Sequence, residues 1–578
     1  MELLSYAQKH ELPVTIPGVL ERSARLYPDR KALVARLKEG DRATTYRELK
    51  DEVEHVASGL IALGLKRGDR VAILGPNSPE WAKAYLGILR AGGINVPLDS
   101  LLSNNELIQL TAKSNVRMAF AAPRFLEIFT ETPDAFPELE QVFCLSPDAA
   151  SPLPGVISMD QLMETGSPKA TGSPKSEPGD LAAIIFTSGT TGTPKGVMLT
   201  HWNIVSDCIS CQIAIDIREE RFLSVLPMHH TFECTAGFML PLFCGCCITF
   251  ARSLKSRYIL EDMKASRCSV MLGVPLLFQK MMEGILRAVN RAPMHRKLLF
   301  HSMWNLVQTA ERLGNKSLGK VLFREMRKKA GLGHIRYFVV GGAPLPSYIP
   351  RFFRHLGIEL LQGYGLTESS PVLTINPPEA PIDESVGKPL PGVEVRVLDP
   401  DSDGIGELAF RGPMIMKGYL DNPEATAEVK DGDGWLHTGD LGYVDKHGYV
   451  FVCGRGKNLI VTAAGKNVYP EEIESMLNKS AIILESMVYG RVAGESMAED
   501  VCAIIVPDYE MLAKVHPEKQ MDDARLRILI DKEIRAVNRE LASYKRIKSF
   551  EIINEELPKT STKKIKRHLF KLPVKPES

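Results

Sequence analysis

Residues 187–196 carry the string Thr-Ser-Gly-Thr-Thr-Gly-Thr-Pro-Lys-Gly, the densest group of phosphate-binding features in this chain. The apolar run Leu181-Ala-Ala-Ile-Ile-Phe186 directly precedes it and predicts a buried strand. The three glycines let successive N–H groups curl around an anion, the Ser and Thr side chains add hydroxyl donors, and Lys195 adds a positive charge. The pattern predicts a phosphate-binding loop at the end of a strand, although a Ser/Thr/Gly surface linker would have the same composition.

The position of the lysine distinguishes this loop from a Walker A loop, in which lysine stands between glycine and Ser or Thr. Here Lys195 follows a proline and precedes a glycine. The stretch Ser188–Gly196 instead resembles the phosphate-loop signature of the adenylate-forming superfamily of acyl-CoA synthetases, luciferases and peptide-synthetase adenylation domains. Further motifs of that superfamily follow in the same order, so the resemblance extends from about Thr45 to Lys564.

The resemblance implies that the loop binds the β and γ phosphates of ATP. It also implies a catalytic role for Lys195 and a magnesium-binding role for Thr190. The loop residues implied to contact the nucleotide are Thr187, Ser188, Gly189, Thr190, Thr191, Gly192 and Lys195.

Two further glycine-rich segments follow strand-like runs. In the first, residues 341–343, the glycines let a flat ligand lie against the backbone, although a plain strand-to-helix turn would need them too. In the second, residues 361–368, Tyr364 can stack on a purine, Thr367 can donate to a phosphate oxygen, and Glu368 can bind magnesium. The superfamily uses the second segment as its adenine and magnesium motif. The nucleotide contacts implied in these segments are Gly341, Gly342, Ala343, Gln362, Gly363, Tyr364, Gly365 and Thr367.

A third region is implied to bind ribose. Asp440 follows a glycine, which suits two hydrogen bonds to ribose hydroxyls, although a turn-capping aspartate would have the same position. The resemblance gives Arg455 a ribose contact and makes Lys457 the hinge residue. From there the pattern changes to a small α+β unit, so we expect a domain boundary between residues 454 and 455.

The C-terminal stretch carries the implied catalytic lysine. Aligned on its Pro-Lys-Thr, the catalytic lysine of the superfamily falls on Lys564. Two residues depart from the superfamily pattern: Lys563 replaces a common glycine, and Ala464 replaces a glycine of the loop that guards the thiol tunnel. Gly465 and Lys466, next to that loop position, are further implied cofactor contacts. A solvated basic tail is the alternative interpretation of the C-terminal stretch.

A histidine pair follows the strand-like residues 223–226. Such a pair often serves packing or capping. In the superfamily, the second histidine of this motif lies near the acyl carboxylate, and the resemblance therefore implies a catalytic role for His230.

Residues 280–336 are strongly basic, with 13 Lys or Arg against 3 Glu, in a chain whose formal net charge is only +1. Their apolar positions have the spacing of amphipathic helices. These positions include Leu298, Leu299, Met303, Leu306 and Val307. The segment is either a solvated helical excursion or a patch that meets anionic lipid or the polyphosphate of coenzyme A. An excursion at this place resembles the longer-chain fatty acyl members of the superfamily.

Composition argues against a nucleic-acid-binding, a secreted or a membrane-spanning protein. A hydrophobic content of 44% and a charged content of 24% are typical of a soluble globular protein, and the net charge gives no sign of a nucleic-acid partner. The first residues lack the basic and apolar parts of a secretory signal. The longest uncharged stretch, residues 234–251, contains Pro241 and predicts a helix, a turn and a buried strand rather than a membrane span.

Ten cysteines include the patterns Cys208-x-x-Cys211 and Cys244-x-Cys246-Cys247. Both pairs lie in helical or apolar runs without the turn residues that present thiolates to zinc, so we expect buried free thiols. This usage fits a reducing cytoplasm.

The alternation of strand-like and helix-like segments from Arg70 to Pro97 predicts a parallel sheet covered by helices. The chain is identified as an α/β protein with a large N-terminal domain and a small mobile α+β C-terminal lid. The resemblance implies ATP-dependent activation of a medium- to long-chain fatty acid and transfer to coenzyme A, with Mg²⁺ as cofactor. The alternatives are an acid–acyl carrier protein ligase, an aryl-CoA ligase, and a non-catalytic nucleotide- or acyl-binding protein. A cytoplasmic location with weak peripheral membrane association is expected, and the oligomeric state stays open.

Overall fold

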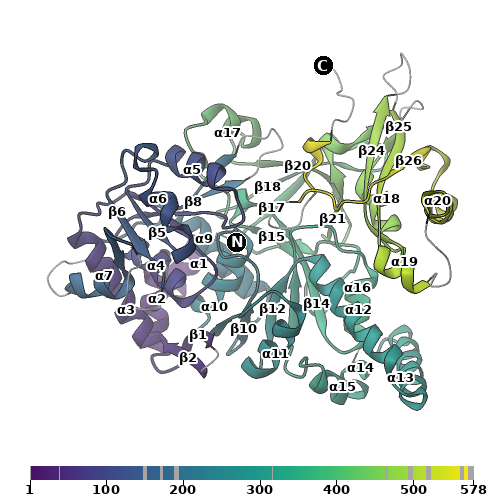
Figure 1. Cartoon of the computed structure of the whole chain (residues 1–578), viewed down its shortest axis with the longest axis horizontal. Helices are drawn as coiled ribbons and strands as arrows, with labels where there is room; N and C mark the ends of the chain where they lie inside the picture. The colour runs from purple at the N-terminus through teal and green to yellow at the C-terminus, as the bar shows by residue number, and fades with distance from the viewer. Residues whose placement is uncertain are drawn as a thin grey trace. The chain divides into compact units, whose positions relative to one another are not determined.

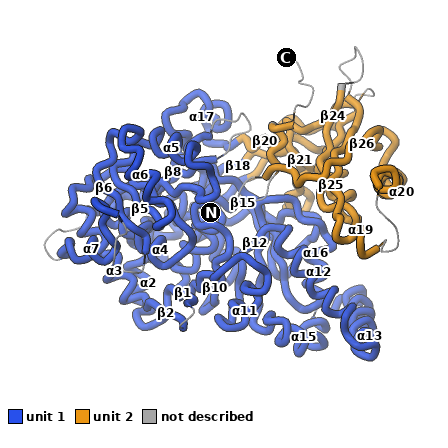
Figure 2. Tube along the Cα trace, in the orientation of Figure 1, with its two compact units in different colours: residues 1–189, 193–394, 410–436 blue, residues 190–192, 395–409, 437–578 orange. Residues whose placement is uncertain are grey.

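The computed structural model (Figure 1) describes residues 2–37, 40–146, 153–168, 174–187, 194–315, 317–462, 466–492, 499–515, 522–559 and 565–570. The chain divides into two units (Figure 2). Unit 1 comprises residues 1–189, 193–394 and 410–436, and unit 2 comprises residues 190–192, 395–409 and 437–578. Unit 2 therefore includes residues on both sides of position 454, and the predicted boundary there remains a prediction.

Unit 1 contains an eight-stranded sheet within the described ranges. Its strands in spatial order are β19 (Gly418–Tyr419), β9 (Lys195–Thr200), β8 (Leu181–Thr187), β4 (Ile94–Pro97), β3 (Arg70–Leu74), β5 (Met118–Ala121), β6 (Gln141–Cys144) and β7 (Val156–Ser158). The strands from β8 to β7 are parallel, whereas β9 runs antiparallel to β8. The predicted parallel sheet and the predicted buried strand before the phosphate loop are therefore confirmed.

A second, nine-stranded sheet of unit 1 is described as well. Its strands in spatial order are β16 (Lys388–Pro389), β15 (Val372–Ile375), β14 (Glu359–Gly365), β13 (Tyr337–Val340), β12 (Val270–Gly273), β10 (Arg221–Ser224), β11 (Cys247–Phe250), β1 (Lys31–Leu37) and β2 (Gly40–Thr45). The strands from β14 to β1 are parallel, and the edge strands β15, β16 and β2 are antiparallel. Parallel strands are buried on both faces, which explains their nearly continuous apolar sequences.

Helices follow many of the strands of unit 1 (Figure 1). They are α1 (Leu3–Lys9), α2 (Ile16–Leu26), α3 (Tyr46–Ala62), α4 (Pro79–Arg90), α5 (Asn104–Lys113), α6 (Leu126–Thr130), α7 (Met159–Thr165), α9 (His201–Ala214), α10 (Leu240–Phe243), α11 (Ser256–Ser266), α12 (Pro275–Arg291), α13 (Met294–Arg312), α14 (Leu318–Leu322), α15 (Arg324–Lys329), α16 (Tyr348–His355) and α17 (Pro423–Val429). Short polar residues start several of them: the side chains of Thr45 and Ser103 accept hydrogen bonds from Glu48 N and Glu106 N in capping boxes. The basic segment folds as helices, as predicted, but α13 carries apolar side chains on both its buried and its exposed side.

The uncharged stretch 234–251 forms the predicted helix, turn and strand. It comprises most of a π-helix, η3 (Phe232–Met239), then α10 and β11. No helix in the part of the chain that the structure describes is long and apolar enough to cross a membrane. All ten cysteines are free thiols, and Cys208 and Cys211 are buried in α9.

Residues 146–179 are rich in Pro, Ser and Gly, a composition that predicts a solvated loop leading into β8, and this prediction is wrong in part. The segment contains β7 and α7, whose residues Met159 and Leu162 are buried. Helix α7 lies so close to α3 that a Cβ atom added at Gly59 would be 2.2 Å from the carbonyl oxygen of Leu162. The Pro, Ser and Gly residues that flank this helix masked its short apolar pattern.

Unit 2 contains most of a four-stranded sheet and the predicted α+β arrangement. The four-stranded sheet has the order β17 (Glu394–Leu398), β18 (Gly406–Arg411), β20 (Leu436–Val444) and β21 (Val450–Arg455). The other elements are β22 (Ile460–Val461), β23 (Asn467–Val468), α18 (Pro470–Leu477), β24 (Ile483–Val492), β25 (Glu499–Pro507), α19 (Tyr509–Val515), α20 (Asp523–Glu540) and β26 (Ser549–Ile552). Apolar side chains of α18, β24, β25 and α20 form its core, among them Ile473, Val488, Ile505 and Ile530.

Candidate active site

The predicted nucleotide motifs of unit 1 follow strands that are neighbours in the nine-stranded sheet. Gly341 directly follows β13, and Gln362 to Gly365 form the end of β14. Val340 and Gln362 are paired in register, so the two motifs start at the same edge. Ligands of open parallel sheets bind outside the carboxyl ends of the strands. The two motifs therefore lie where a ligand of this sheet is expected.

Local geometry explains two of the glycines. Gly342 has a φ of +84°, a left-handed conformation that strains other residues. At Gly365 an added Cβ atom would be 1.8 Å from the carbonyl oxygen of Pro371, because β15 folds back against β14. Between the glycines, Tyr364 is half-buried, and its ring centroid lies 5.9 Å from that of Phe410. A second aromatic ring therefore lies next to the predicted stacking residue.

The phosphate loop begins and ends on paired strands. Thr187 of β8 lies opposite Lys195 of β9 in antiparallel register. Six residues between them lie outside the described residues, including the predicted contacts Ser188, Gly189, Thr190, Thr191 and Gly192. The structure thus describes the base of the predicted loop, where Thr187 and Lys195 are held side by side.

Tyr419 links Lys195 to Glu368. The ammonium of Lys195 lies 4.9 Å from the centroid of the Tyr419 ring, and the Tyr419 hydroxyl donates a 2.8 Å hydrogen bond to Glu368 Oε1. Burial and the neighbouring Glu368 carboxylate raise the pKa of the Tyr419 phenol well above its usual value, so the phenol remains a donor. The sequence interpretation missed Tyr419, because it lies in a two-residue strand that no periodicity marks.

A cluster at the ends of β4 and β10 contains the predicted His230. The rings of His229 and His230 are 4.3 Å apart, and His229 Nε2 lies 3.3 Å from Asp99 Oδ1. Ligand atoms of these three side chains lie within 4.8 Å of one another. The sequence interpretation missed Asp99 and His229, which come together only because unit 1 brings the ends of both strands to one place.

Asn77 fixes the backbone that leads to this cluster. Its amide donates hydrogen bonds to Ser224 Oγ at 2.9 Å and to Leu226 O at 2.6 Å, and its oxygen accepts from Met228 N at 2.9 Å. Asn77 follows β3 of the eight-stranded sheet, whereas Ser224 ends β10 of the nine-stranded sheet and Leu226 and Met228 follow it. These bonds hold the segment before His229 against the other sheet of unit 1.

In unit 2 the predicted ribose residues form an ion pair. Asp440 of β20 and Arg455 of β21 are opposite each other in antiparallel register, and Arg455 Nε lies 2.9 Å from Asp440 Oδ1. Asp440 is buried, whereas the Arg455 side chain is 41% exposed. The pair therefore presents an oriented carboxylate and a partly exposed guanidinium, groups that can bind vicinal hydroxyls.

Two other predicted residues of unit 2 are exposed lysines. Lys457 lies in a short 3₁₀ helix (Gly456–Asn458), and the backbone of Lys466 forms hydrogen bonds with Thr462. Ala464 and Gly465 lie outside the described residues.

Lys563 and Lys564 also lie outside the described residues, but the chain on either side of them is fixed. Lys559 and Ile565 form an antiparallel bridge, and Lys566 N donates a 2.8 Å hydrogen bond to Pro558 O. The described residues on the two sides of the predicted catalytic lysine are therefore paired with each other.

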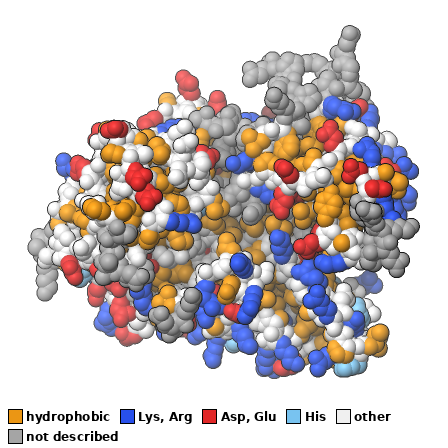
Figure 3. All heavy atoms as spheres, in the orientation of Figure 1, with side chains coloured by type: hydrophobic (Ala, Val, Ile, Leu, Met, Phe, Trp, Pro, Cys, Tyr) orange, Lys and Arg blue, Asp and Glu red, His pale blue; other side chains and the backbone are white. Residues whose placement is uncertain are grey.

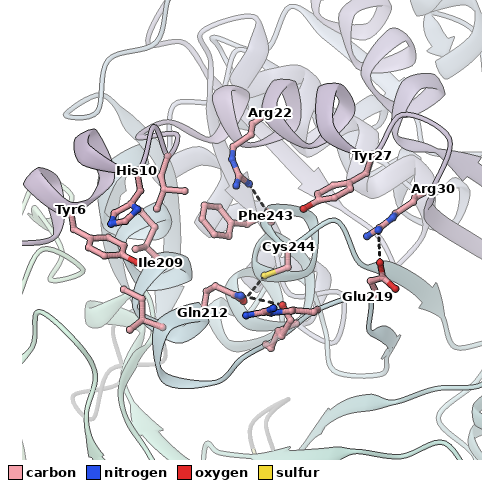
Figure 4. Close-up of a pocket in the computed structure, with 14 residues that line it drawn as sticks. Tyr6, His10, Arg22, Tyr27, Arg30, Ile209, Gln212, Glu219, Phe243 and Cys244 are labelled. Atoms are coloured by element: carbon pink, nitrogen blue, oxygen red, sulfur yellow. Dashed lines mark hydrogen bonds and ion pairs between the residues drawn. The ribbon is translucent and has the colours of Figure 1, made fainter.

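A cavity of about 500 Å³ lies elsewhere in unit 1 (Figure 4). Tyr6, Arg22, Gln212, Glu219 and Cys244 are among the described residues that line it, and none of its lining residues is a predicted site residue. Glu219 and Cys244 precede β10 and β11, so the cavity lies at the amino ends of these strands. It is distinct from the edge that carries His230.

Comparison with known proteins agrees with this geometry. The AMP-binding enzyme family matches residues 20–420, and the C-terminal domain of AMP-binding enzymes matches residues 457–572. The long-chain-fatty-acid–CoA ligase heimdall of Drosophila melanogaster is 32% identical over 499 residues, which cover 81% of this chain and 73% of that protein. The chloroplastic long-chain-fatty-acid–[acyl-carrier-protein] ligase AEE15 of Arabidopsis thaliana is 28% identical over 590 residues, which cover 90% of this chain and 80% of that protein.

Solved structures show the same fold. The ATP-bound MatB from Rhodopseudomonas palustris has a TM-score of 0.76 and 27% identity to this chain, with coverage of 96% of this chain and 98% of that one. The predicted α/β fold, with a large N-terminal part and a smaller C-terminal one, is confirmed. The chain belongs to the AMP-binding enzymes, the adenylate-forming family whose acid–thiol ligases use ATP, Mg²⁺ and coenzyme A.

Proposed function

We propose that this protein activates a medium- to long-chain fatty acid as an acyl-adenylate and transfers the acyl group to coenzyme A. The observation that carries the proposal is the chain of contacts from Lys195 through Tyr419 to Glu368 beside the carboxyl edge of the sheet. A cation and a carboxylate fixed around one phenol suit a polyphosphate and its metal ion. The names of the long-chain ligase relatives support the substrate class.

The reaction divides into two displacements. A carboxylate oxygen of the fatty acid attacks the α-phosphorus of ATP, a P–O bond forms, and the bond to the β-phosphate oxygen breaks, so that pyrophosphate leaves. The sulfur of coenzyme A then attacks the acyl carbon, a C–S bond forms, and AMP leaves with the bonding electrons. Neither step needs a side-chain nucleophile, so positioning and charge stabilisation by the protein dominate the catalysis.

Each group in the proposal follows from its chemistry. Lys195 and the phosphate loop hold the β and γ phosphates, Tyr364 stacks on adenine, and the Asp440–Arg455 pair binds ribose. Glu368 and Thr190 offer the hard oxygen ligands that Mg²⁺ prefers, and Mg²⁺ would neutralise phosphate charge. His230 lies near the acyl carboxylate, and the neighbouring His229 lies beside Asp99. Lys564 stabilises charge at the α-phosphate in the first step only.

Acid-dependent exchange of pyrophosphate into ATP tests the first step. Glu368→Gln is expected to fold normally and to lose exchange by roughly 10²-fold or more, because the metal ion loses a charged ligand. Glu379→Gln is the matched control, since Glu379 is an exposed acid of the same chain. Exchange by Glu368→Gln within a few-fold of wild type would show that the metal assignment is wrong.

Release of AMP over a panel of straight-chain and aryl acids defines the substrate, and the acceptor test compares coenzyme A with an acyl carrier protein. The second test matters because the relative AEE15 of Arabidopsis thaliana is a carrier-protein ligase by its name. Membership of the ligase family supports an enzyme rather than a non-catalytic binder. The cytoplasmic location remains part of this proposal, as does weak association with anionic membranes.

A further inference from the structure

Helix α13 has an inner face that anchors it firmly to unit 1. Phe300, Trp304 and Val307 lie on this face at helical spacing, and Phe300 and Val307 are buried. The Trp304 ring lies 5.3 Å from Phe352 and 4.8 Å from His355 of α16. One turn further, Glu311 accepts hydrogen bonds from Arg354 at 2.8 Å and pairs with His355 at 2.5 Å. These contacts fix the rotation of α13, so its opposite face is fixed in the outward direction.

That outer face is also apolar. Leu298, Leu306 and Leu313 follow one another along it, and their exposed fractions are 61%, 52% and 82%. Met294 and Leu299 at the start of the helix are exposed as well. Isolated exposed apolar residues are common on proteins, but here four lie on the exposed side of one helix and the fifth, Leu313, caps its C-terminal end, so apolar side chains gather on this side. The outer face of α13, defined by these five residues, therefore favours an apolar contact.

The charges around the outer face are almost all positive. Each of the three acids in the segment already has a basic partner. These pairs are Glu283–Arg287 at 3.6 Å, Glu311–Arg354 at 2.8 Å and Glu325–Lys328 at 3.0 Å. In contrast, Arg291, Arg296, Arg312 and Lys320 have no carboxylate of a described residue within 4 Å. Figure 3 shows Lys and Arg side chains over the part of unit 1 where Figure 1 draws α12 and α15.

We propose that the outer face of α13 docks onto an anionic lipid bilayer, with its leucines at the level of the acyl chains and the surrounding Arg and Lys side chains at the phosphate headgroups. The combination of an apolar helix face with a basic border is typical of helices that lie in a membrane interface. An acidic protein would account for the charges but not for five exposed apolar side chains on one helix. This inference rests on the weak association with anionic membranes that is part of the proposed function, and it deepens that proposal by naming the surface; it is independent of the reaction.

The docking has two separable parts. Each Lys or Arg near an anionic surface strengthens binding by about fivefold at low salt, and this part is screened within about 10 Å at 0.1 M salt. The leucines contribute through removal of apolar surface from water, which salt does not screen. Binding is therefore expected to weaken with salt but to persist at a level that depends on the leucines.

Co-sedimentation of the full chain with vesicles tests both parts. The vesicles contain phosphatidylcholine with about 30 mol% phosphatidylglycerol, or phosphatidylcholine alone, at about 50 mM and about 500 mM NaCl. The double variant Leu298→Asp/Leu306→Asp is expected to bind at least about tenfold more weakly than wild type at both salt concentrations. The double variant Arg296→Glu/Lys320→Glu is expected to bind the anionic vesicles more weakly than wild type at low salt and as strongly as wild type at high salt. Ile528→Asp, at a 68% exposed position of α20, is the matched control and should bind like wild type.

Three results would overturn the proposal. In the first, wild type does not bind the anionic vesicles; in the second, the leucine double variant binds them as well as wild type does. In the third, wild type binds no vesicles but is a dimer, and Leu298→Asp/Leu306→Asp converts this dimer to a monomer. The last result would assign the face to a second copy of the chain. Circular dichroism and thermal unfolding check that the variants fold. AMP release with soluble octanoate should be equal in all variants. If wild type binds vesicles but releases no AMP, this result would contradict only the proposed reaction.

Discussion

Glu233 is a carboxylic acid that the fold keeps away from water. It lies in the π-helix η3 and is 1% exposed, and its carboxylate oxygens form no hydrogen bond of regular geometry with a described residue, although Ser224 and the N–H of Leu226 are near. Gly237 leaves the space for the carboxyl group, since an added Cβ atom there would be 2.6 Å from Glu233 Cδ. Burial raises the pKa of Glu233 to about 8, and nearby Ser224 and the N–H of Leu226 only partly offset this effect. Glu233 is therefore neutral in the folded protein at neutral pH.

The perturbation is Glu233→Gln, which keeps the shape and removes the titration. An unfolded glutamate ionises near pH 4.5, whereas the folded one ionises near pH 8. Between these values the folded state holds one more proton than the unfolded state, so the free energy of unfolding falls as the pH rises. The contribution is fully present below pH 4.5 and is lost as the pH rises through 8. At 1.36 kcal/mol per pH unit, the loss from pH 5.5 to 7.5 is about 2.5 kcal/mol.

Thermal unfolding of wild type and Glu233→Gln at pH 5.5 and pH 7.5 measures this loss. With an unfolding entropy near 2 cal/mol/K per residue for a unit as large as unit 1, the Tm should fall by about 2 to 3 °C more in wild type than in the variant between pH 5.5 and pH 7.5. Burial lowers the pKa of His201 to about 4, so His201 raises the free energy of unfolding as the pH rises over part of the same range. This contribution is common to wild type and variant and cancels in the comparison. Glu233→Met is the second variant and should also lack the loss. Equal shifts with pH in wild type and both variants would refute the assignment of a neutral Glu233.

Two further predictions concern the proposed reaction. Tyr419→Phe removes a hydrogen bond to a carboxylate, which is worth about 1.5 to 3 kcal/mol, so pyrophosphate exchange should fall by at least about tenfold with a higher KM for Mg²⁺; unchanged exchange would separate Tyr419 from the site. Lys564→Ala should lose roughly 10²- to 10³-fold in acyl-adenylate formation but still convert supplied acyl-adenylate and coenzyme A to thioester, because the lysine acts in the first step only. Lys563→Ala is its control; a first-step defect in that variant alone would move the catalytic lysine by one position.

Most of the elements discussed above were predictable from the sequence. The apolar run 181–186 predicted β8, the strand-helix alternation from residue 70 predicted the parallel sheet, and the change of pattern after residue 455 predicted a separate α+β arrangement. These predictions succeed because burial of a strand or helix face imposes a local period on the sequence. The expectation for residues 146–179 failed where α7 is too short for such a period to outweigh its Pro, Ser and Gly neighbours.

The local motifs likewise predicted roles for Tyr364, Glu368, Asp440 and Arg455, because each motif lies within a few consecutive residues. Which residues contact them depends on the tertiary structure. Tyr419 reaches Glu368 only through the pairing of β19 with β9, and Asp99 reaches His229 only because two sheets meet at one edge.

Helix α13 shows the same limit at the surface. Its sequence carries apolar residues on both faces, so no periodicity could tell Val307, which is buried, from Leu306, which is exposed. The contacts of Trp304 and Glu311 with α16 choose the inner face. A sequence fixes the chemistry of each side chain and the local period, but which faces and which distant residues meet depends on the order of the strands and the rotation of the helices, which are set by packing across the whole of unit 1.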